Sequence, residues 1–147
     1  MRIFHLTGGF MDIKKLSEKI REATPFIKHL DVEITQGAGS EYTEIRMPLK
    51  PEFTQHLGHA HGGVVGTLAD IAANLACKQP TVTVEYKINF LKAAAGNELV
   101  ARSHPVKEGS TLIIVQSDVF AVENAQETKV ATCLATLIPS AKPKAKN

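Results

Sequence analysis

The sequence has no tryptophan, and aromatic side chains make up only 5% of its 147 residues. It also has no uninterrupted apolar run of about 18 residues, the length that a membrane-spanning helix needs. The apolar run at the N-terminus is too short for a signal peptide, and we therefore expect a cytoplasmic protein that does not enter a membrane. The scarcity of aromatic rings gives no sign of a pocket built for stacking, although an aliphatic pocket also accepts a phenyl ring.

Neither sign of charge is in large excess. The chain has 17 basic and 15 acidic residues, for a formal net charge of +2. Nucleic-acid-binding domains carry a stripe of lysine and arginine with aromatic residues between them, and no such stripe occurs before the C-terminal tail. We therefore expect no nucleic-acid partner and favour a small molecule. The tail, residues 140–147, is rich in lysine, and we expect it to be solvated.

Cysteine is scarce as well. Cys77 and Cys133 stand far apart in apolar segments, without the CxxC spacing or the histidine pair of a zinc site. We expect both to be buried, reduced thiols. His56, His59 and His61 alternate along one loop, but alternate histidines without a further ligand pattern are weak evidence for a metal. We therefore expect neither a metal ion nor another cofactor.

The length predicts a single domain over residues 1–147, large enough to bury a sizeable core. Residues 1–11 are expected to form a flexible N-terminal extension, and either Met1 or Met11 fits as the start of translation. No internal repeat is visible.

The first half of the chain mixes helical and strand patterns. Apolar residues three and four apart predict a short surface helix over residues 12–23, ended by Pro25. Two strands are expected next, at residues 30–35 and 41–47, joined in a hairpin by a glycine-bearing turn. An irregular stretch then leads into a long apolar helix over residues 61–78.

After Pro80 the hydrophobic pattern changes to a period of two. Apolar residues alternate with polar ones over residues 82–90, which predicts a long, half-buried strand. Three further strands are separated by turn-forming residues, as in an antiparallel meander. We place these strands at residues 97–107, 111–122 and 126–138. Pro105 would interrupt a ladder of hydrogen bonds, so we expect a bulge or a sheet edge there.

The most informative segment is HGGVVGTLAD, residues 61–70. It opens an almost wholly apolar helix, which we expect the rest of the protein to surround. An ionised Asp70 is costly in such a place, so it is either bonded to Thr67 or Asn74 on neighbouring turns or used in chemistry. The first two glycines leave N–H groups open at the positive end of the helix dipole, where a developing negative charge is stabilised.

These elements predict an α+β fold in which one antiparallel sheet curls around a long central helix. The order of elements and the block HGG-x4-LAD over residues 61–70 resemble the hotdog-fold thioesterases, in particular the phenylacetate-pathway (PaaI-like) type. The resemblance runs from about Ile34 to Ile138. The strand over residues 82–91 follows the block at the family's usual distance.

The resemblance implies an enzyme that hydrolyses acyl-coenzyme A thioesters, as homodimers or as homotetramers built from two dimers, with active sites shared between subunits. The family's catalytic acid matches Asp70, as general base or nucleophile, and its backbone donor matches Gly62. Thr83 matches a residue that often orients the attacking water. Gln55 stands six places before the histidine of the block, where relatives frequently have asparagine.

Further candidate substrate contacts are His61, Gly63 and His56. Relatives often have an arginine that meets a cofactor phosphate, placed after the glycine of a turn where this chain has Ser110. The alternative cations are Lys107, Arg102, Lys87 and the lysines of the tail.

The spacing of Asp70 and Gly62 bears on assembly. Eight residues of helix at about 1.5 Å per residue separate them by roughly 12 Å, so one thioester group cannot touch both. Two such helices packed antiparallel across a two-fold axis would bring Asp70 of one chain to Gly62 of the other. Once this chemistry is accepted, the spacing favours a dimer with two equivalent sites.

Plainer interpretations stay open for each candidate. Asp70 could be a structural acid, the two glycines could serve close packing alone, and His61 could be a structural contact at the helix start. Thr83 could simply be a good strand former. The alternative function is a hotdog protein that binds an acyl thioester without hydrolysing it. A hydratase on the same fold would need a histidine paired closely with the acid, and the helix of Asp70 supplies none.

Overall fold

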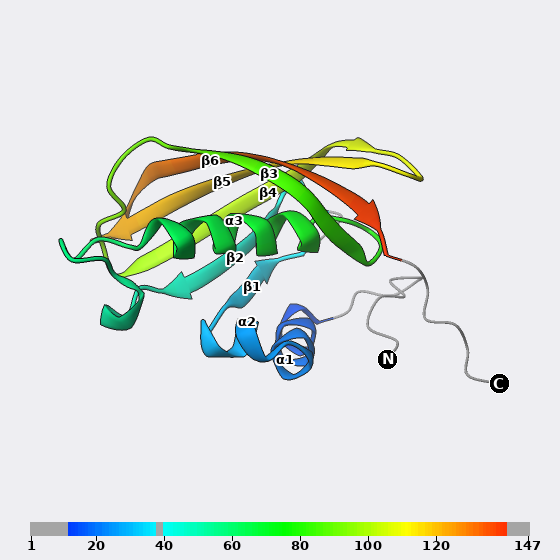
Figure 1. Ribbon diagram of the computed structural model, residues 1–147. Coiled ribbons are helices and arrows are strands. Elements are labelled where there is room, and N and C mark those ends of the chain that lie inside the picture. Colours follow the sequence, from blue (N-terminus) through cyan, green and yellow to red (C-terminus); the bar gives the residue numbers. More distant parts are fainter. Residues whose placement is uncertain (1–11, 38–39, 141–147) are drawn as a thin grey trace.

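One six-stranded sheet and one central helix organise the protein (Figure 1). The structure, a computed structural model, describes residues 12–37 and 40–140. The predicted N-terminal extension and, from residue 141 on, the predicted basic tail lie outside these ranges. The helices are α1 (Ile13–Ala23), α2 (Pro25–His29) and α3 (Gly62–Leu75), with a 3-10 turn η1 (Pro51–Phe53). The strands are β1 (Glu33–Gln36), β2 (Thr43–Pro48), β3 (Thr81–Phe90), β4 (Glu98–Glu108), β5 (Ile113–Glu123) and β6 (Gln126–Pro139).

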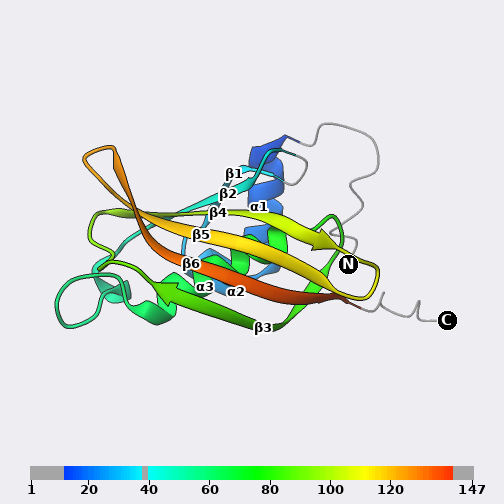
Figure 2. The same cartoon turned by 90° about the horizontal axis from the view of Figure 1, so that it is seen from above.

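The strands follow the order β1-β2-β4-β5-β6-β3 across the sheet, and every neighbouring pair is antiparallel. The sheet curls around α3, which lies against its concave face (Figures 1 and 2). This confirms the predicted α+β architecture and the hairpin of β1 and β2. The predicted meander is confirmed for β4, β5 and β6 but is wrong for β3, which pairs with β6 at the far edge. The reason is that α3 carries the chain across the concave face before β3 begins.

The structure adds one helix, α2, to those predicted, and it shifts the start of β1 and the end of α3. Helix α1 ends just before Pro25 as expected, but Pro25 also occupies the first turn of α2, where its missing N–H is no loss. Helix α2 leads to Asp31, whose φ of 58° marks a tight turn, so the first strand starts later than predicted, at Glu33. Helix α3 ends at Leu75 rather than at Lys78.

Within the described ranges, no helix has both the length and the hydropathy to cross a membrane.

The positions of β3 that face α3 are odd-numbered before Val84 and even-numbered after it. Thr83 and Glu85 are consecutive in the pairing with β6, so the register shifts at Val84. Before the shift, the threonines bond to α3, while Val82 and Val84 are 53% and 57% exposed. After the shift, Tyr86 faces α3. The predicted apolar inner face is therefore wrong for the first half of the strand.

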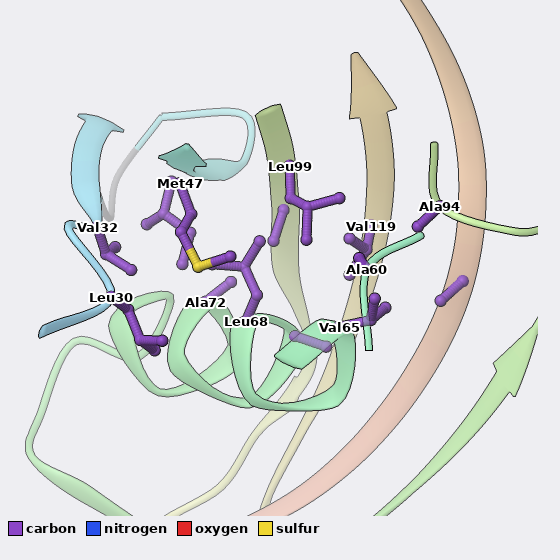
Figure 3. Packing of buried hydrophobic residues seen from close by; sticks show 14 of the residues in the cluster. Leu30, Val32, Met47, Ala60, Val65, Leu68, Ala72, Ala94, Leu99 and Val119 are labelled. Atoms are coloured by element: carbon purple, nitrogen blue, oxygen red, sulfur yellow. The ribbon is translucent and has the colours of Figure 1, made fainter. Parts of the chain in front are cut away.

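The core lies between α3 and the concave face of the sheet (Figure 3). The helix buries Val65, Leu68, Ala69 and Ala72. The sheet contributes side chains that include Met47, Leu99 and Val119. The opposite side of the helix stays partly exposed at Thr67, Asp70 and Asn74. The expectation that the rest of the protein surrounds this helix is therefore wrong within a single chain.

Pro105 lies where the sheet tolerates a missing N–H. The pairing of β4 with β2 reaches only as far as Ser103. The register between β4 and β5 also shifts between Pro105 and Lys107. Because of these two features, Pro105 does not stand in a central ladder where its missing N–H would leave a hydrogen bond unmade. The predicted bulge or edge is therefore confirmed.

Cys77 and Cys133 are both free and buried, as predicted. Burial raises the pKa of the Cys133 thiol to about 11, and it also raises the pKa of Cys77. Both thiols are therefore protonated at neutral pH, and they pack as small apolar side chains.

Replacing Leu68 by alanine tests the core. Leu68 is fully buried at the centre of α3, so the variant should lose about 2–5 kcal/mol of the free energy of unfolding. Urea unfolding at a fixed protein concentration measures the loss. Leu57 is 67% exposed, and the control Leu57→Ala should change the same quantity by less than about 0.5 kcal/mol. Equal losses in the two variants would contradict this assignment of the core.

Candidate active site

Helix α3 and strand β3 run antiparallel and meet at successive turns of the helix. The contacts pair Gly62 with Phe90, Gly66 with Tyr86, Asp70 with Thr83, and Asn74 with Thr81. A β-carbon at Gly62 would lie 3.3 Å from the Phe90 ring, and one at Gly66 would lie 3.1 Å from the Tyr86 hydroxyl. These two glycines therefore let the aromatic rings of β3 approach the helix backbone, which gives Gly62 a packing role whatever else it does.

The polar end of this contact holds Asp70. The Thr83 hydroxyl donates to Asp70 Oδ1 at 2.6 Å, and Asn74 Nδ2 lies 3.4 Å from the same oxygen. Thr67, the other predicted partner, donates instead to the carbonyl oxygen of Gly63 at 2.8 Å. Asp70 Oδ2 has no hydrogen-bond partner among the described residues. One carboxylate oxygen is thus held, and the other is left for water or substrate.

His61 caps the start of α3. Its Nδ1 accepts a hydrogen bond from Gly63 N–H at 2.9 Å, and its carbonyl oxygen accepts from Val64 and Val65 N–H at 2.9 and 3.1 Å. The amide of Gly63 is therefore already in use, and His61 makes a structural contact. Within the described ranges, Gly62 N–H has no acceptor. The first turn thus offers this one donor at the positive end of the helix dipole.

A cavity of about 290 Å³ opens beside this donor. Its lining includes Gln55, His59, Gly62, Phe90 and Lys92. The loop positions Gln55, whose backbone N–H donates to the His59 carbonyl oxygen at 2.8 Å and whose Oε1 accepts from Leu57 N–H. Its Nε2 remains as a side-chain donor. Gln55 and Gly62 thus share one cavity, whereas His56 is exposed and does not line it.

Within one chain the two groups of candidate residues stay apart. Asp70 and Thr83 do not line the cavity beside Gly62. Asp70 and Gly62 belong to one continuous helix, and its rise separates them by roughly 12 Å along the axis. The fold therefore brings Thr83 to Asp70 and Gln55 to Gly62, but it does not bring these two pairs together.

Two of the cations expected to meet a phosphate have partners on the protein. Arg102 donates to Glu44 at 2.7 Å and to the two carboxylate oxygens of Glu127 at 2.6 and 2.7 Å. These bonds hold the pKa of Glu127 below its usual range. Lys87 donates to a neighbouring side chain of β3 at 2.8 Å. Lys92, which no sequence pattern indicated, is the lysine that lines the cavity.

The three histidines of the loop have separate surroundings. His61 caps α3, His59 lines the cavity and His56 is exposed. In the part of the chain that the structure describes, no group of three or more histidine, cysteine, aspartate or glutamate side chains could hold a metal ion.

Comparison of the sequence with known proteins finds esterases and thioesterases. Residues 57–128 match the thioesterase superfamily. A putative esterase of Saccharolobus solfataricus is 34% identical over 110 residues, which cover 71% of this chain and 77% of that protein. Acyl-coenzyme A thioesterase 13 of Homo sapiens is 32% identical over 119 residues, which cover 77% of this chain and 85% of that protein.

Solved structures share the architecture. A thioesterase family protein from Silicibacter pomeroyi superposes with a TM-score of 0.74 at 30% identity, covering 83% of this chain and 93% of that one. The E. coli PaaI protein from the phenylacetic acid degradation operon superposes with a TM-score of 0.73, covering 88% and 97%. Its identity of 20% makes this a likeness of fold. Sequence and architecture agree, and the chain belongs to the thioesterase superfamily, with the hotdog fold.

Proposed function

We propose that the protein hydrolyses an acyl-coenzyme A to the free acid and coenzyme A, with Asp70 as general base or nucleophile. The arrangement of Asp70 carries this proposal: Thr83 holds Oδ1 at 2.6 Å, and Oδ2 has no partner among the described residues. The similarity to a human protein named acyl-coenzyme A thioesterase supports the choice of substrate.

Hydrolysis needs an activated oxygen nucleophile and a donor for the carbonyl oxygen. As general base, Asp70 Oδ2 accepts a proton from water, and the water oxygen attacks the carbonyl carbon. The carbonyl oxygen becomes negative and accepts hydrogen bonds from Gly62 N–H and Gln55 Nε2. The carbon–sulfur bond then breaks, and the leaving thiolate takes the proton from Asp70. As nucleophile, Oδ2 attacks the carbonyl carbon instead, and the carbon–sulfur bond breaks to release coenzyme A as its thiolate. Water then hydrolyses the resulting anhydride, which regenerates the carboxylate of Asp70, releases the acid and supplies the proton that the thiolate takes up.

Two copies of the chain share each site in this proposal, because Asp70 and Gly62 stand roughly 12 Å apart on one helix. The edge strand β3 supports a dimer. Among the described residues it pairs only with β6, and Val82, Val84 and Phe90 are 53%, 57% and 56% exposed. An apolar edge of this kind pairs with another strand unless it is covered. Pairing of β3 with β3 would set the two α3 helices antiparallel.

The outer face of the sheet supports a tetramer made of two such dimers. Leu134 and Ile138 of β6 are 47% and 40% exposed on that face, next to β3. Exposed apolar patches of this kind mark surfaces where proteins associate.

The cavity beside Gly62 has room for part of the coenzyme A portion of the substrate. It adjoins the free N–H donor, and Lys92 contributes a positive charge to its lining. An ammonium group at this place would bind a phosphate of the cofactor portion of the substrate.

Replacing Asp70 by asparagine should keep the fold and slow hydrolysis by about 100-fold or more, because the amide is nearly isosteric but cannot accept the proton or attack. Release of free thiol from a panel of acyl-coenzyme A substrates measures the rate, and the melting temperature checks the fold. Wild-type turnover by this variant on every accepted substrate would contradict the role of Asp70. A wild-type protein that binds these substrates without releasing thiol would instead support a hotdog protein that only binds thioesters.

Replacing Gln55 or Thr83 should slow hydrolysis less than replacing Asp70, because Thr83 positions the carboxylate and Gln55 supplies one of two hydrogen bonds to the carbonyl oxygen, whereas Asp70 takes part in the bond changes. Gln55→Ala and Thr83→Ala are each expected to lower kcat by roughly 10-fold, with smaller changes in KM. Thr83→Ser keeps the hydroxyl that bonds to Asp70 and should be the mildest change. Steady-state kinetics decide the matter, since an alanine variant with wild-type constants removes that residue from the proposed site.

Subunit mixing tests the shared site. Gly62 is the first residue of α3, and the preceding His61 is extended with ψ of 136°, so the backbone accepts proline at position 62, which removes the N–H donor. Like alanine, proline requires the Phe90 ring to move by a few tenths of an ångström. Gly62→Pro and Asp70→Asn should each be inactive alone. Mixed in equal amounts, they should recover about a quarter of wild-type activity, because about half of the dimers are mixed and each has one intact site of two.

Gly62→Ala is the matched control for this experiment. Alanine also adds a β-carbon close to Phe90, but it keeps the N–H. It should therefore retain more activity than Gly62→Pro, and equal losses would assign the effect to bulk rather than to the donor. Mass spectrometry verifies the exchange of subunits. Recovery no greater than the sum of the two separate variants would show that the site is not shared.

A further inference from the structure

Asn74 lies one turn after Asp70 on α3 and joins the same polar contact with β3. Its Nδ2 lies 2.9 Å from Thr83 Oγ1 and 3.0 Å from the carbonyl oxygen of Asp70. Its Oδ1 accepts a hydrogen bond from the Thr81 hydroxyl at 2.8 Å. Asn74 is therefore bonded to both threonines that face α3 from the first half of β3.

These contacts give the hydrogen bonds one direction. Because the carbonyl oxygen of Asp70 only accepts, the amide is oriented with Nδ2 toward it and toward Thr83, and Oδ1 then accepts from Thr81. An amide nitrogen only donates, so Thr83 Oγ1 accepts from it and keeps its single proton for Asp70 Oδ1, 2.6 Å away. The bonds therefore run from Thr81 through Asn74 and Thr83 to Asp70, where they end on the oxygen that is held.

The carboxylate of Asp70 needs such support. The terminal torsion of an aspartate side chain is broad, so hydrogen bonds rather than the rotamer decide where its two oxygens point. Without the Asn74 donor, the Thr83 hydroxyl is free to rotate and to donate elsewhere. Oδ2 is then no longer directed to one place.

We infer that Asn74 is a positioning residue, which acts by directing the Thr83 hydroxyl to Asp70 and so fixes the free carboxylate oxygen. This role rests on the proposed function of Asp70. It differs from the structural pairing of Asn74 with Asp70 expected from helix spacing, because the decisive contact runs through Thr83 of the neighbouring strand.

The variant Asn74→Asp tests the positioning role while it leaves the packing of residue 74 nearly unchanged. Aspartate has nearly the same size and still accepts from Thr81, but an ionised carboxylate cannot donate to Thr83. The Thr83 proton is then drawn away from Asp70. We expect kcat for thioester hydrolysis to fall by about 10-fold or more, with KM changed by less than about 2-fold. Asn97→Asp makes the same change of charge at an exposed position and should keep the wild-type kcat. The uncharged variant Asn74→Ala distinguishes loss of the donor from repulsion between the new carboxylate and Asp70, whose Oδ1 lies 3.4 Å from Asn74 Nδ2.

A second test compares the hydrolysis rates of variants that lack the Asn74 side chain, the Thr83 side chain or both. If Asn74 acts through Thr83, the double variant Asn74→Ala, Thr83→Ala should be no slower than Thr83→Ala alone. Independent effects of the two residues would multiply instead. Rates are taken per folded molecule, and if Asn74→Asp does not fold, the alanine variants decide the matter.

A wild-type kcat in Asn74→Asp would overturn the positioning role, and so would multiplying losses in the double variant. Either result leaves the assignment of Asp70 standing, because that assignment is tested by Asp70→Asn alone. A wild-type protein that releases no thiol from any acyl-coenzyme A would overturn the proposed function and the positioning role together.

Discussion

The fold and the candidate site both depend on the packing of α3 against the edge strand β3. Two glycines of the helix leave its backbone open to the rings of Tyr86 and Phe90. Further along the same contact, Thr83 reaches the carboxylate of Asp70. A side chain at Gly66, one turn before Asp70, would press against the Tyr86 ring and so displace the strand that carries Thr83. Packing on one turn of the helix therefore supports chemistry on the next.

The length of α3 links the proposed reaction to assembly. The free amide of Gly62 stands at the helix start, and Asp70 stands two turns further on, at a separation that the rigid backbone does not change. A single chain therefore holds every residue of the proposed site but cannot place them around one thioester. In the proposed dimer, association itself completes the active site, so catalysis would depend on protein concentration at high dilution.

Regular patterns predicted most of the elements, because a helix and a half-buried strand each repeat with their own hydrophobic period. The place of β3 was not predictable in this way, since the period reports which face of a strand is buried and not which strand lies beside it. The extra residue at Val84 inverts the alternation, so threonines face the helix where valines were expected. Asp70 was conspicuous as a carboxylate in an apolar helix. Asn74 was predicted only as a helical partner of Asp70, and Lys92 was not predicted at all, because the contact with Thr83 comes from the neighbouring strand and the place of Lys92 comes from the walls of a cavity.

The register shift at Val84 sets which positions of β3 face the helix on either side of it. In a strand with strict alternation, the position that faces the helix at one end determines which positions face it at the other. Here the odd positions, Thr81 and Thr83, carry hydroxyl groups beside the carboxylate, and the even positions, Tyr86 and Phe90, carry the rings beside the glycines. A residue inserted or deleted between Thr83 and Tyr86 would therefore turn either the hydroxyl groups or the rings away from the helix.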